Sequence, residues 1–294
     1  MASAIVLCAG LGTRLRPLTD ELPKPLVPVG DRSILEHALG QLHAAGFSEL
    51  VVNAHHLASL FEPVLARFHA RVQLVVEGAE IRGTAGGVAG ARPHFSAGPV
   101  LVWNGDILVE PPLTALLQAV RPEGFCLGVA PRDRGAGTVG LDSSGRVVRL
   151  RGERFGEEAE GGDYVGVLAL GADALARLPE HGCLFGDAAL PFLRAGGVVQ
   201  SVAVTRPWTD AGDAAGLLRA NQAWLEERGL DAYLGDVVEL PAGIELRGTV
   251  VGAGARLSGA GRLEGSLVCA GASASAPLFD AIVAPSGRVI QSHA

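Results

Sequence analysis

Lysine is almost absent from this sequence, and cysteine, tyrosine and methionine are scarce. Lys24 is the only lysine, and the other 23 of the 24 basic residues are arginine. The four cysteines stand singly, without the C-x-x-C spacing of a zinc site, at Cys8, Cys126, Cys183 and Cys269. This pattern predicts reduced, mostly buried thiols rather than disulfides or zinc ligands.

Long apolar runs and an excess of positive charge are also missing. No run reaches the roughly 18 apolar residues that a membrane span needs. The short apolar start at 4–7 has no basic segment before it and no cleavage site after it, so the sequence predicts no signal peptide and a cytoplasmic location. The formal net charge of -7 argues against a nucleic-acid surface. We therefore expect neither a nucleic acid nor a membrane as a partner.

Short β-rich runs alternate with helical runs as far as about residue 230, which predicts an α/β fold with a mainly parallel sheet. The predicted strands are 4–8, 50–53, 72–76, 100–103 and 125–130. Helices are predicted at 35–42, 57–68 and 113–120. The turn-forming residues 142–145 predict a hairpin that joins 138–141 to 147–150.

A second texture begins at about residue 236, where small residues and isolated aliphatic residues replace the helical pattern. Val251, Leu257 and Leu263 lie six residues apart, and Val283 and Val289 resume the interval. This spacing predicts a short left-handed β-helix of about three coils. The alternative is a Gly-rich linker, which would not need the aliphatic spacing. We expect a first domain at 1–233 and a β-helix at 234–294, whose role is oligomerisation or lid support in a homo-oligomer.

The residues after the first strand have the composition of a phosphate-binding loop. Glycines there allow close approach of a ligand and turn backbone N–H groups toward phosphate oxygens. The loop consists of Ala9, Gly10, Leu11, Gly12, Thr13 and Arg14. Leu15 stands where a dinucleotide fingerprint needs its third glycine, and no Walker A sequence is present. A simple tight turn is the alternative interpretation.

Basic residues lie at the end of this loop and shortly after it. Arg14 and Arg16 lie close in sequence to Lys24, and a proline stands on each side of Lys24. An anion site needs cations in fixed positions, and the flanking prolines restrict the backbone at this lysine.

From Leu7 to Leu26 the chain resembles the sugar-phosphate nucleotidylyltransferase family, whose signature is L-x-A-G-x-G-T-R-L-x-P-L-T followed by P-K-P-L. Cys8 stands where the family usually has Ala. The resemblance continues through Glu77 with the 83–87 segment G-T-A-G-G, through N-G-D at 104–106, and through W-x-D-x-G at 208–212.

This resemblance implies a Rossmann-like fold with helices on both faces of the sheet, and a set of site residues. Asp106 and Asp210 would bind one Mg²⁺, which suits hard carboxylate oxygens. Arg14 would contact the outer phosphates, and Lys24 the α-phosphate or the incoming sugar phosphate. The remaining nucleotide contacts would come from residues 9–13 and from Glu77, Gly83, Thr84 and Ala85. Each aspartate could instead merely close a turn after a strand.

The sugar side matches the family less well. The resemblance places Gly140, Glu153, Tyr164 and Gly166 at the sugar-phosphate site. However, Glu153-Arg154-Phe155 replaces an E-K-P motif, and Tyr164 replaces an asparagine. These departures leave the sugar open, and Glu153 could instead be an exposed loop charge.

The implied reaction transfers a nucleotidyl group from an NTP to a sugar 1-phosphate and releases pyrophosphate. A carboxylate at Glu77 can accept hydrogen bonds from both N1–H and the exocyclic amine of guanine, which favours GTP. The motif combination looks most like mannose-1-phosphate guanylyltransferases. Uridylyl or thymidylyl transfer to a heptose, muramate or glucose 1-phosphate is the alternative. A non-catalytic sugar-nucleotide-binding subunit is a further one, which the presence of all four catalytic residues disfavours.

Overall fold

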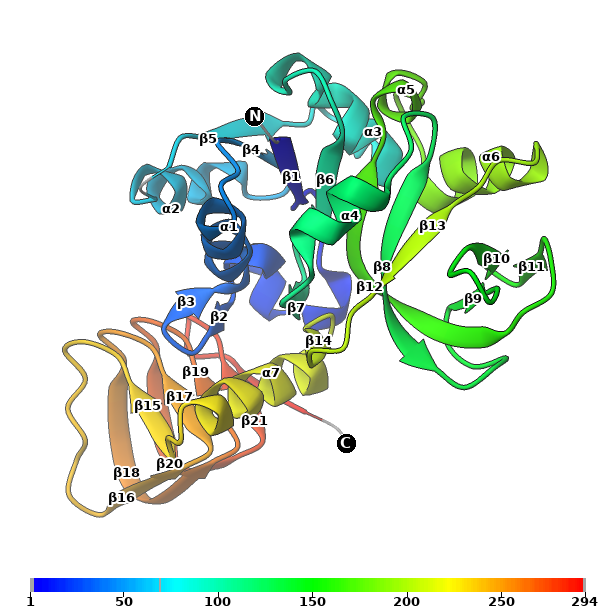
Figure 1. The fold of residues 1–294 in the computed structure, drawn as a ribbon. Coiled ribbons are helices and arrows are strands. Elements are labelled where there is room, and N and C mark those ends of the chain that lie inside the picture. Colours follow the sequence, from blue (N-terminus) through cyan, green and yellow to red (C-terminus); the bar gives the residue numbers. More distant parts are fainter. Residues whose placement is uncertain (1–2, 69, 293–294) are drawn as a thin grey trace. The chain divides into compact units, whose positions relative to one another are not determined.

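The computed structural model describes residues 3–68 and 70–292 (Figure 1). Contacts divide the chain into two compact units. Unit 1 comprises Met1–Gly10, Ala38–Gly105 and Val109–Trp208, and unit 2 comprises Leu11–His37, Asp106–Leu108 and Thr209–Ala294. No helix in the part of the chain that is described is long and apolar enough to cross a membrane.

Unit 1 is built on a ten-stranded mixed sheet. Its parallel part has the order β6-β1-β4-β5, with bounds β1 (Ser3–Leu7), β4 (Glu49–Ala54), β5 (Val72–Val76) and β6 (Val100–Asn104). The long strand β12 (Glu160–Leu170) pairs antiparallel with β6, β8 (Phe125–Arg132) and β9 (Val139–Leu141). The remaining strands are β10 (Val147–Leu150), β11 (Glu153–Arg154) and β13 (Gln200–Ala203). The predicted α/β class and the 138–150 hairpin are confirmed.

Both faces of the sheet are covered. Ala4, Ile5 and Val6 are successive residues of β1, and none is more than 1% exposed. Because successive side chains of a strand point to opposite faces, burial of all three requires packing on both sides. The helices are α1 (Ile34–Ala44), α2 (Glu62–Ala66), α3 (Gly83–Gly90), α4 (Leu113–Ala119), α5 (Ala172–Ala176) and α6 (Leu190–Arg194).

Two helices differ from the sequence prediction. The predicted helix at 57–68 is divided into a 3-10 turn at Ala58–Leu60 and the five-residue α2. Leu57 takes a left-handed conformation with φ of 51°, and Pro63 has no N–H to donate. The segment 83–87, for which no helix was predicted, is the first part of α3.

Unit 2 contains α7 (Ala214–Glu227) and two ladders of parallel strands. One ladder consists of β15 (Ala232–Leu234), β17 (Thr249–Val251), β19 (Leu267–Val268) and β21 (Ala281–Val283). The other consists of β16 (Ile244–Arg247), β18 (Arg256–Glu264) and β20 (Ser273–Phe279). Val250 pairs with Leu267, 17 residues later, and Leu267 pairs with Ile282, 15 residues later. The repeat is therefore shorter than the roughly 18 residues of three hexapeptides.

The predicted aliphatic spacing marks buried positions in this repeat. Val251, Leu263 and Val283 are fully buried, and Leu257 is 9% exposed. Val289 is the exception at 51% exposed. It lies on β22 (Val289–Gln291), which runs antiparallel to β21 and ends the ladder.

A single hydrophobic core joins the strand ladders to the N-terminal part of unit 2. Leu217, Leu218 and Leu225 on α7 belong to this core together with aliphatic residues of the ladders. The same core contains Leu15, Leu18, Val27 and Val29. These residues belong to Leu11–His37, which we call the Lys24 segment. Between β21 and β22, the Ser286 N–H and hydroxyl groups donate to the Glu21 carboxylate. The Lys24 segment is therefore packed on the C-terminal strands.

Candidate active site

The side chains of Lys24 and Asp106 form an ion pair within unit 2, with Nζ 2.6 Å from Oδ2. Lys24 begins a 3-10 turn, Lys24–Leu26, directly after Pro23. The backbone N–H groups of Leu26 and Val27 donate to the carbonyls of Pro23 and Lys24 and close this turn. Lys24 is 7% exposed, so its ammonium group is fixed by both backbone and burial.

Gly12 packs closely against the side chain of Lys24. It has φ of 62°, and a Cβ added there would lie 2.8 Å from Thr19 Cγ2 and 3.2 Å from Lys24 Cβ. The Thr19 hydroxyl donates to the Gly12 carbonyl at 2.8 Å. Only glycine satisfies both the backbone conformation and this close approach. The neighbouring residues Leu11 and Thr13 are exposed, so this loop is open to a ligand.

Asp210 and Arg14 both lie close to a second close-packed glycine. A Cβ on Gly212 would lie 2.5 Å from both Arg14 Nη2 and Asp210 Oδ1. Ala211 lies between Asp210 and Gly212, and its backbone N–H donates to the Asp106 carbonyl at 3.0 Å. The paired strands β7 (Ile107–Val109) and β14 (Trp208–Asp210) carry this junction. Unit 2 thus brings together all four residues that were predicted to be catalytic.

The two carboxylates have the donor chemistry that Mg²⁺ prefers. Mg²⁺ is usually bound by one or two carboxylates and takes its other ligands from water and phosphate oxygens. Within residues 3–68 and 70–292, no group of three or more His, Cys, Asp or Glu side chains forms a metal cage. Asp106 and Asp210 would supply carboxylate oxygens of the kind that such an ion takes from a protein.

In unit 1, the loop that follows β1 is tied to two buried polar side chains. The Cys8 N–H donates to Asn53 Oδ1 at 2.8 Å. Asn53 Nδ2 donates to Glu77 Oε1 at 2.7 Å, and the Arg82 N–H donates to Glu77 Oε2 at 2.9 Å. Asn53 is 2% exposed and Glu77 is 6% exposed. Asn53 was not predicted, since nothing distinguishes it in sequence from any polar residue at the end of a strand.

Ala9 and Gly10 complete the unit 1 part of the loop. A Cβ on Gly10 would meet no atom within 4 Å, so space remains beside this glycine. On the predicted base segment, the Ala85 N–H donates to the Gly182 carbonyl at 2.9 Å. Thr84 Oγ1 accepts from the Leu184 N–H at 2.8 Å. The first turn of α3, which Gly83 begins, is therefore braced by the 182–184 segment.

The predicted sugar residues lie on the antiparallel half of the unit 1 sheet. Gly140 is on β9, and both Tyr164 and Gly166 are on β12. The Tyr164 ring packs edge-on against Phe185 with centroids 4.8 Å apart. Both Glu153 oxygens accept hydrogen bonds from Arg194, so this carboxylate is engaged by the protein.

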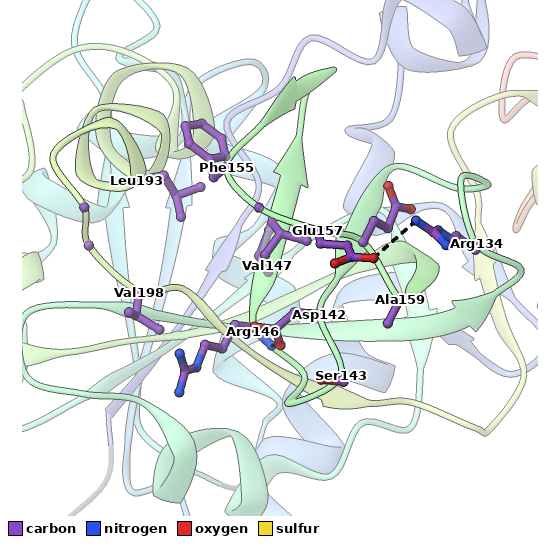
Figure 2. Close-up of a pocket in the computed structure, with 15 residues that line it drawn as sticks. Arg134, Asp142, Ser143, Arg146, Val147, Phe155, Glu157, Ala159, Leu193 and Val198 are labelled. Carbon is purple, nitrogen blue, oxygen red and sulfur yellow. Dashed lines mark hydrogen bonds and ion pairs between the residues drawn. The ribbon is translucent and has the colours of Figure 1, made fainter.

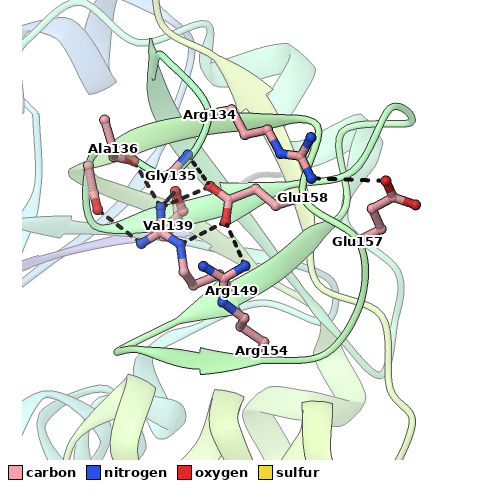
Figure 3. A network of polar contacts seen from close by, with 9 residues as sticks. Arg134, Gly135, Ala136, Val139, Arg149, Arg154, Glu157 and Glu158 are labelled. Carbon is pink, nitrogen blue, oxygen red and sulfur yellow. Dashed lines mark hydrogen bonds and ion pairs between the residues drawn. The ribbon is translucent and has the colours of Figure 1, made fainter.

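A network around Glu158 fixes the loop beside Gly140 (Figure 3). The Glu158 side chain is 2% exposed and accepts from Arg149 at 3.0 Å and from the Gly135 N–H at 2.9 Å. Arg149 also donates to the carbonyls of Ala136, Gly137 and Val139. The hydrogen bond from Arg149 outweighs burial and lowers the pKa of Glu158 to about 2.

We expect Glu158→Gln to lower the free energy of unfolding by about 2–3 kcal/mol at pH 7, because Arg149 would lose its charged partner in a buried site. The pKa of Glu158 falls from 4.5 to about 2 on folding, so the stabilisation is complete above pH 4.5 and is lost as pH falls toward 2. Urea unfolding should therefore show the gap between wild type and variant closing over this range. The control Glu157→Gln removes an exposed pair with Arg134 at 4.0 Å and should change stability by less than about 0.5 kcal/mol. An equal loss in both variants would contradict this account.

A hollow of about 710 Å³ lies beside β10 and the 155–159 segment. Figure 2 shows Arg146, Asp142 and Phe155 among the side chains around it. None of the predicted site residues lines this hollow. One residue of its lining, Glu158, lies next to the predicted sugar residue Gly140.

Comparison with known proteins gives matches along most of the chain. The family described as Nucleotidyl transferase matches residues 3–227. An N-acetylmuramate alpha-1-phosphate uridylyltransferase from Neisseria meningitidis serogroup B is 40% identical over 118 residues, which are 39% of this chain and 51% of the relative. A mannose-1-phosphate guanylyltransferase from Mycobacterium tuberculosis is 27% identical over 308 residues, which cover 98% of this chain and 82% of the relative.

Among solved structures, HddC from Yersinia pseudotuberculosis superposes with a TM-score of 0.65 and 20% identity. The match covers 76% of this chain and 100% of that chain, and at this identity it establishes the fold alone. The chain spans about half the length of the Neisseria relative, and 45% of a similar uridylyltransferase from Caulobacter vibrioides.

Proposed function

Because the chain belongs to the nucleotidyl transferase family, we propose that it transfers a nucleotidyl group from a nucleoside triphosphate to a sugar 1-phosphate. A sugar-phosphate oxygen would attack the α-phosphorus, and the bond from that phosphorus to the oxygen bridging to the β-phosphorus would break. Pyrophosphate would leave with that electron pair. The observation that carries this proposal is the pair that the buried Lys24 forms at 2.6 Å with the partly exposed Asp106, together with Arg14 and Asp210 in the same unit.

The residues would act by position and charge, because phosphoryl-type transfer needs little covalent chemistry from a protein. Lys24 would place a compact positive charge at the α-phosphate or the incoming sugar phosphate. Arg14 would bind the outer phosphates, and the N–H groups of residues 10–13 would donate to phosphate oxygens. Asp106 and Asp210 would hold Mg²⁺, which when bound neutralises charge on the phosphates.

For the substrates, we propose GTP and mannose 1-phosphate. The guanylyltransferase relative supports this choice, since its match extends along 98% of the chain. The second candidate is UTP with N-acetylmuramate 1-phosphate, which the 40% identity to the Neisseria enzyme favours. We also propose that residues 1–233 carry the transferase site, and that 234–294, which shares a core with Leu15, Leu18, Val27 and Val29, is a left-handed β-helix that supports a homo-oligomer.

A pyrophosphate-release panel tests this function. GTP, UTP, dTTP, ATP and CTP are each combined with mannose, glucose and N-acetylmuramate 1-phosphates, with and without Mg²⁺. We expect release only when a sugar 1-phosphate and Mg²⁺ are both present, and greatest release with GTP and mannose 1-phosphate. A maximum with UTP would replace the proposed substrates, and release without any sugar phosphate would contradict the reaction. The variant Asp106→Ala is the blank, because it should lose roughly 100-fold or more in rate.

A further inference from the structure

We propose that Asn53 and Glu77 are positioning residues that couple the phosphate loop to the base segment, an inference that rests on the proposed function. Two side chains form a continuous hydrogen-bonded link from the Cys8 N–H to the Arg82 N–H. Cys8 directly precedes Ala9 and Gly10, and Arg82 directly precedes Gly83. We call this link the Asn53–Glu77 relay.

The relay stands where the strand ladder ends. Leu7 on β1 pairs with Asn53 on β4, and Cys8 is the first residue beyond this pairing. The Glu77 N–H donates to the Ala54 carbonyl at 2.8 Å and continues the pairing of β5 with β4 by one residue. The Asn53 amide therefore replaces a backbone partner for Cys8 and fixes the direction in which the phosphate loop leaves the sheet.

Helix α3 packs against the relay at a glycine, Gly87. A Cβ on Gly87 would lie 2.6 Å from Asn53 Nδ2 and 3.1 Å from Glu77 Oε1. No side chain larger than hydrogen fits there without displacing one of the two groups. The helix that carries the base segment thus packs directly on the residues that set the phosphate loop.

The burial of the carboxylate explains why these contacts are specific. Glu77 is 6% exposed and each of its oxygens already accepts from an N–H group of the protein. A buried charge requires such donors, and a donor that loses its acceptor here has little water to replace it. Glu77 therefore acts on a bound nucleotide by holding Arg82 and Asn53 in place. Direct pairing of Glu77 with a base is the alternative that the experiment must separate.

A hydrogen-bond swap provides the test. In Glu77→Gln, the single amide oxygen can accept from either Asn53 or Arg82, and the amide nitrogen faces the other donor. In Asn53→Asp, two carboxylates face each other, and when both are ionised neither can donate a hydrogen bond to the other. In Asn53→Asp/Glu77→Gln, the new carboxylate can accept from Cys8 and from the new side-chain amide nitrogen, while the oxygen of that amide accepts from Arg82. The double variant alone restores all three hydrogen bonds.

We expect each single variant at pH 8.5 to speed amide hydrogen exchange at Cys8 and Arg82 in the substrate-free protein, and to weaken GTP binding by about 10-fold or more. The double variant should return exchange and binding to within about 3-fold of wild type, with the nucleotide preference unchanged. The exposed neighbour Glu80 supplies the control Glu80→Gln, which should change neither quantity.

Three results would overturn the proposal. Unchanged exchange in the single variants would remove the relay itself. Loss of GTP binding in the double variant equal to that in Glu77→Gln, despite restored exchange, would show that the carboxylate contacts the base directly. A single variant that fails to fold leaves the double variant, whose failure to fold would contradict the swap. Because exchange is measured without substrate, it judges the relay even if the pyrophosphate panel refutes the proposed function.

Discussion

Lys24→Arg should lower kcat/KM by at least about 30-fold, or about 2 kcal/mol, although the charge is kept. The lysine ammonium is a compact point charge, whereas the guanidinium group is planar, wider and suited to bidentate contacts. Lys24 is 7% exposed and its Nζ lies 2.6 Å from Asp106 Oδ2. An arginine cannot place a single N–H group at that point without moving the turn that carries it.

A matched control variant separates an effect on catalysis from a general intolerance of this segment to exchange of lysine and arginine. Arg16→Lys exchanges the same two residue types eight positions earlier, at an exposed side chain 3.2 Å from Asp20. We expect this control to keep its activity within about 2-fold, since an exposed pair contributes little. The thermal midpoint of Lys24→Arg should fall by only a few degrees, equivalent to about 1–2 kcal/mol of overpacking. Wild-type kinetics from Lys24→Arg would refute the role assigned to this lysine.

Removal of residues 234–294 should abolish both nucleotide transfer and cooperative unfolding of the segment 11–37. Leu15, Leu18, Val27 and Val29 are each no more than 1% exposed and share one core with the C-terminal strands. Burial of one such side chain contributes about 1.5–3 kcal/mol. Exposing several of these side chains at once would cost a free energy that approaches the roughly 5–15 kcal/mol by which a domain is stable.

Smaller changes allow this prediction to be read quantitatively. Leu263→Ala removes a fully buried side chain from the same core and should cost about 2–5 kcal/mol. Val237→Ala changes a side chain that is 91% exposed and should alter stability by less than about 0.5 kcal/mol. Turnover and thermal unfolding of the truncated chain and both variants provide the measurement. Full activity in the truncated chain would show that the Lys24 segment folds without the C-terminal strands.

Much of the fold follows from local pattern. The runs that form β1, β4, β5, β6 and β8 could be predicted because each is a short, mainly apolar, β-prone segment between turn signals. Helix α3 could not be predicted this way, because glycine is unfavourable inside a helix. Its glycines are explained by tertiary contacts, since a Cβ on Gly86 would lie 2.3 Å from the Glu180 carbonyl oxygen.

The candidate site shows the same division. The motifs identify Lys24, Asp106 and Asp210 by residue type and order, and the family that these motifs predicted is confirmed. Spacing along the chain does not reveal that Lys24 pairs with Asp106, or that Arg14 and Asp210 both lie close to Gly212. Asn53 could not be predicted, because its importance arises only where three strand ends meet. Long-range contacts of this kind depend on the folded sheet and not on any local pattern.

The most direct test of the central claim follows the α-phosphorus. The protein is incubated with Mg²⁺, mannose 1-phosphate and GTP labelled at the α-phosphorus, in a single turnover with enzyme in excess. We predict that the label passes into GDP-mannose at the rate at which unlabelled pyrophosphate appears, and that Asp106→Ala and Lys24→Arg slow both together. Label that stays in GTP, or that appears as free GMP with mannose 1-phosphate unchanged, would contradict nucleotidyl transfer to the sugar phosphate.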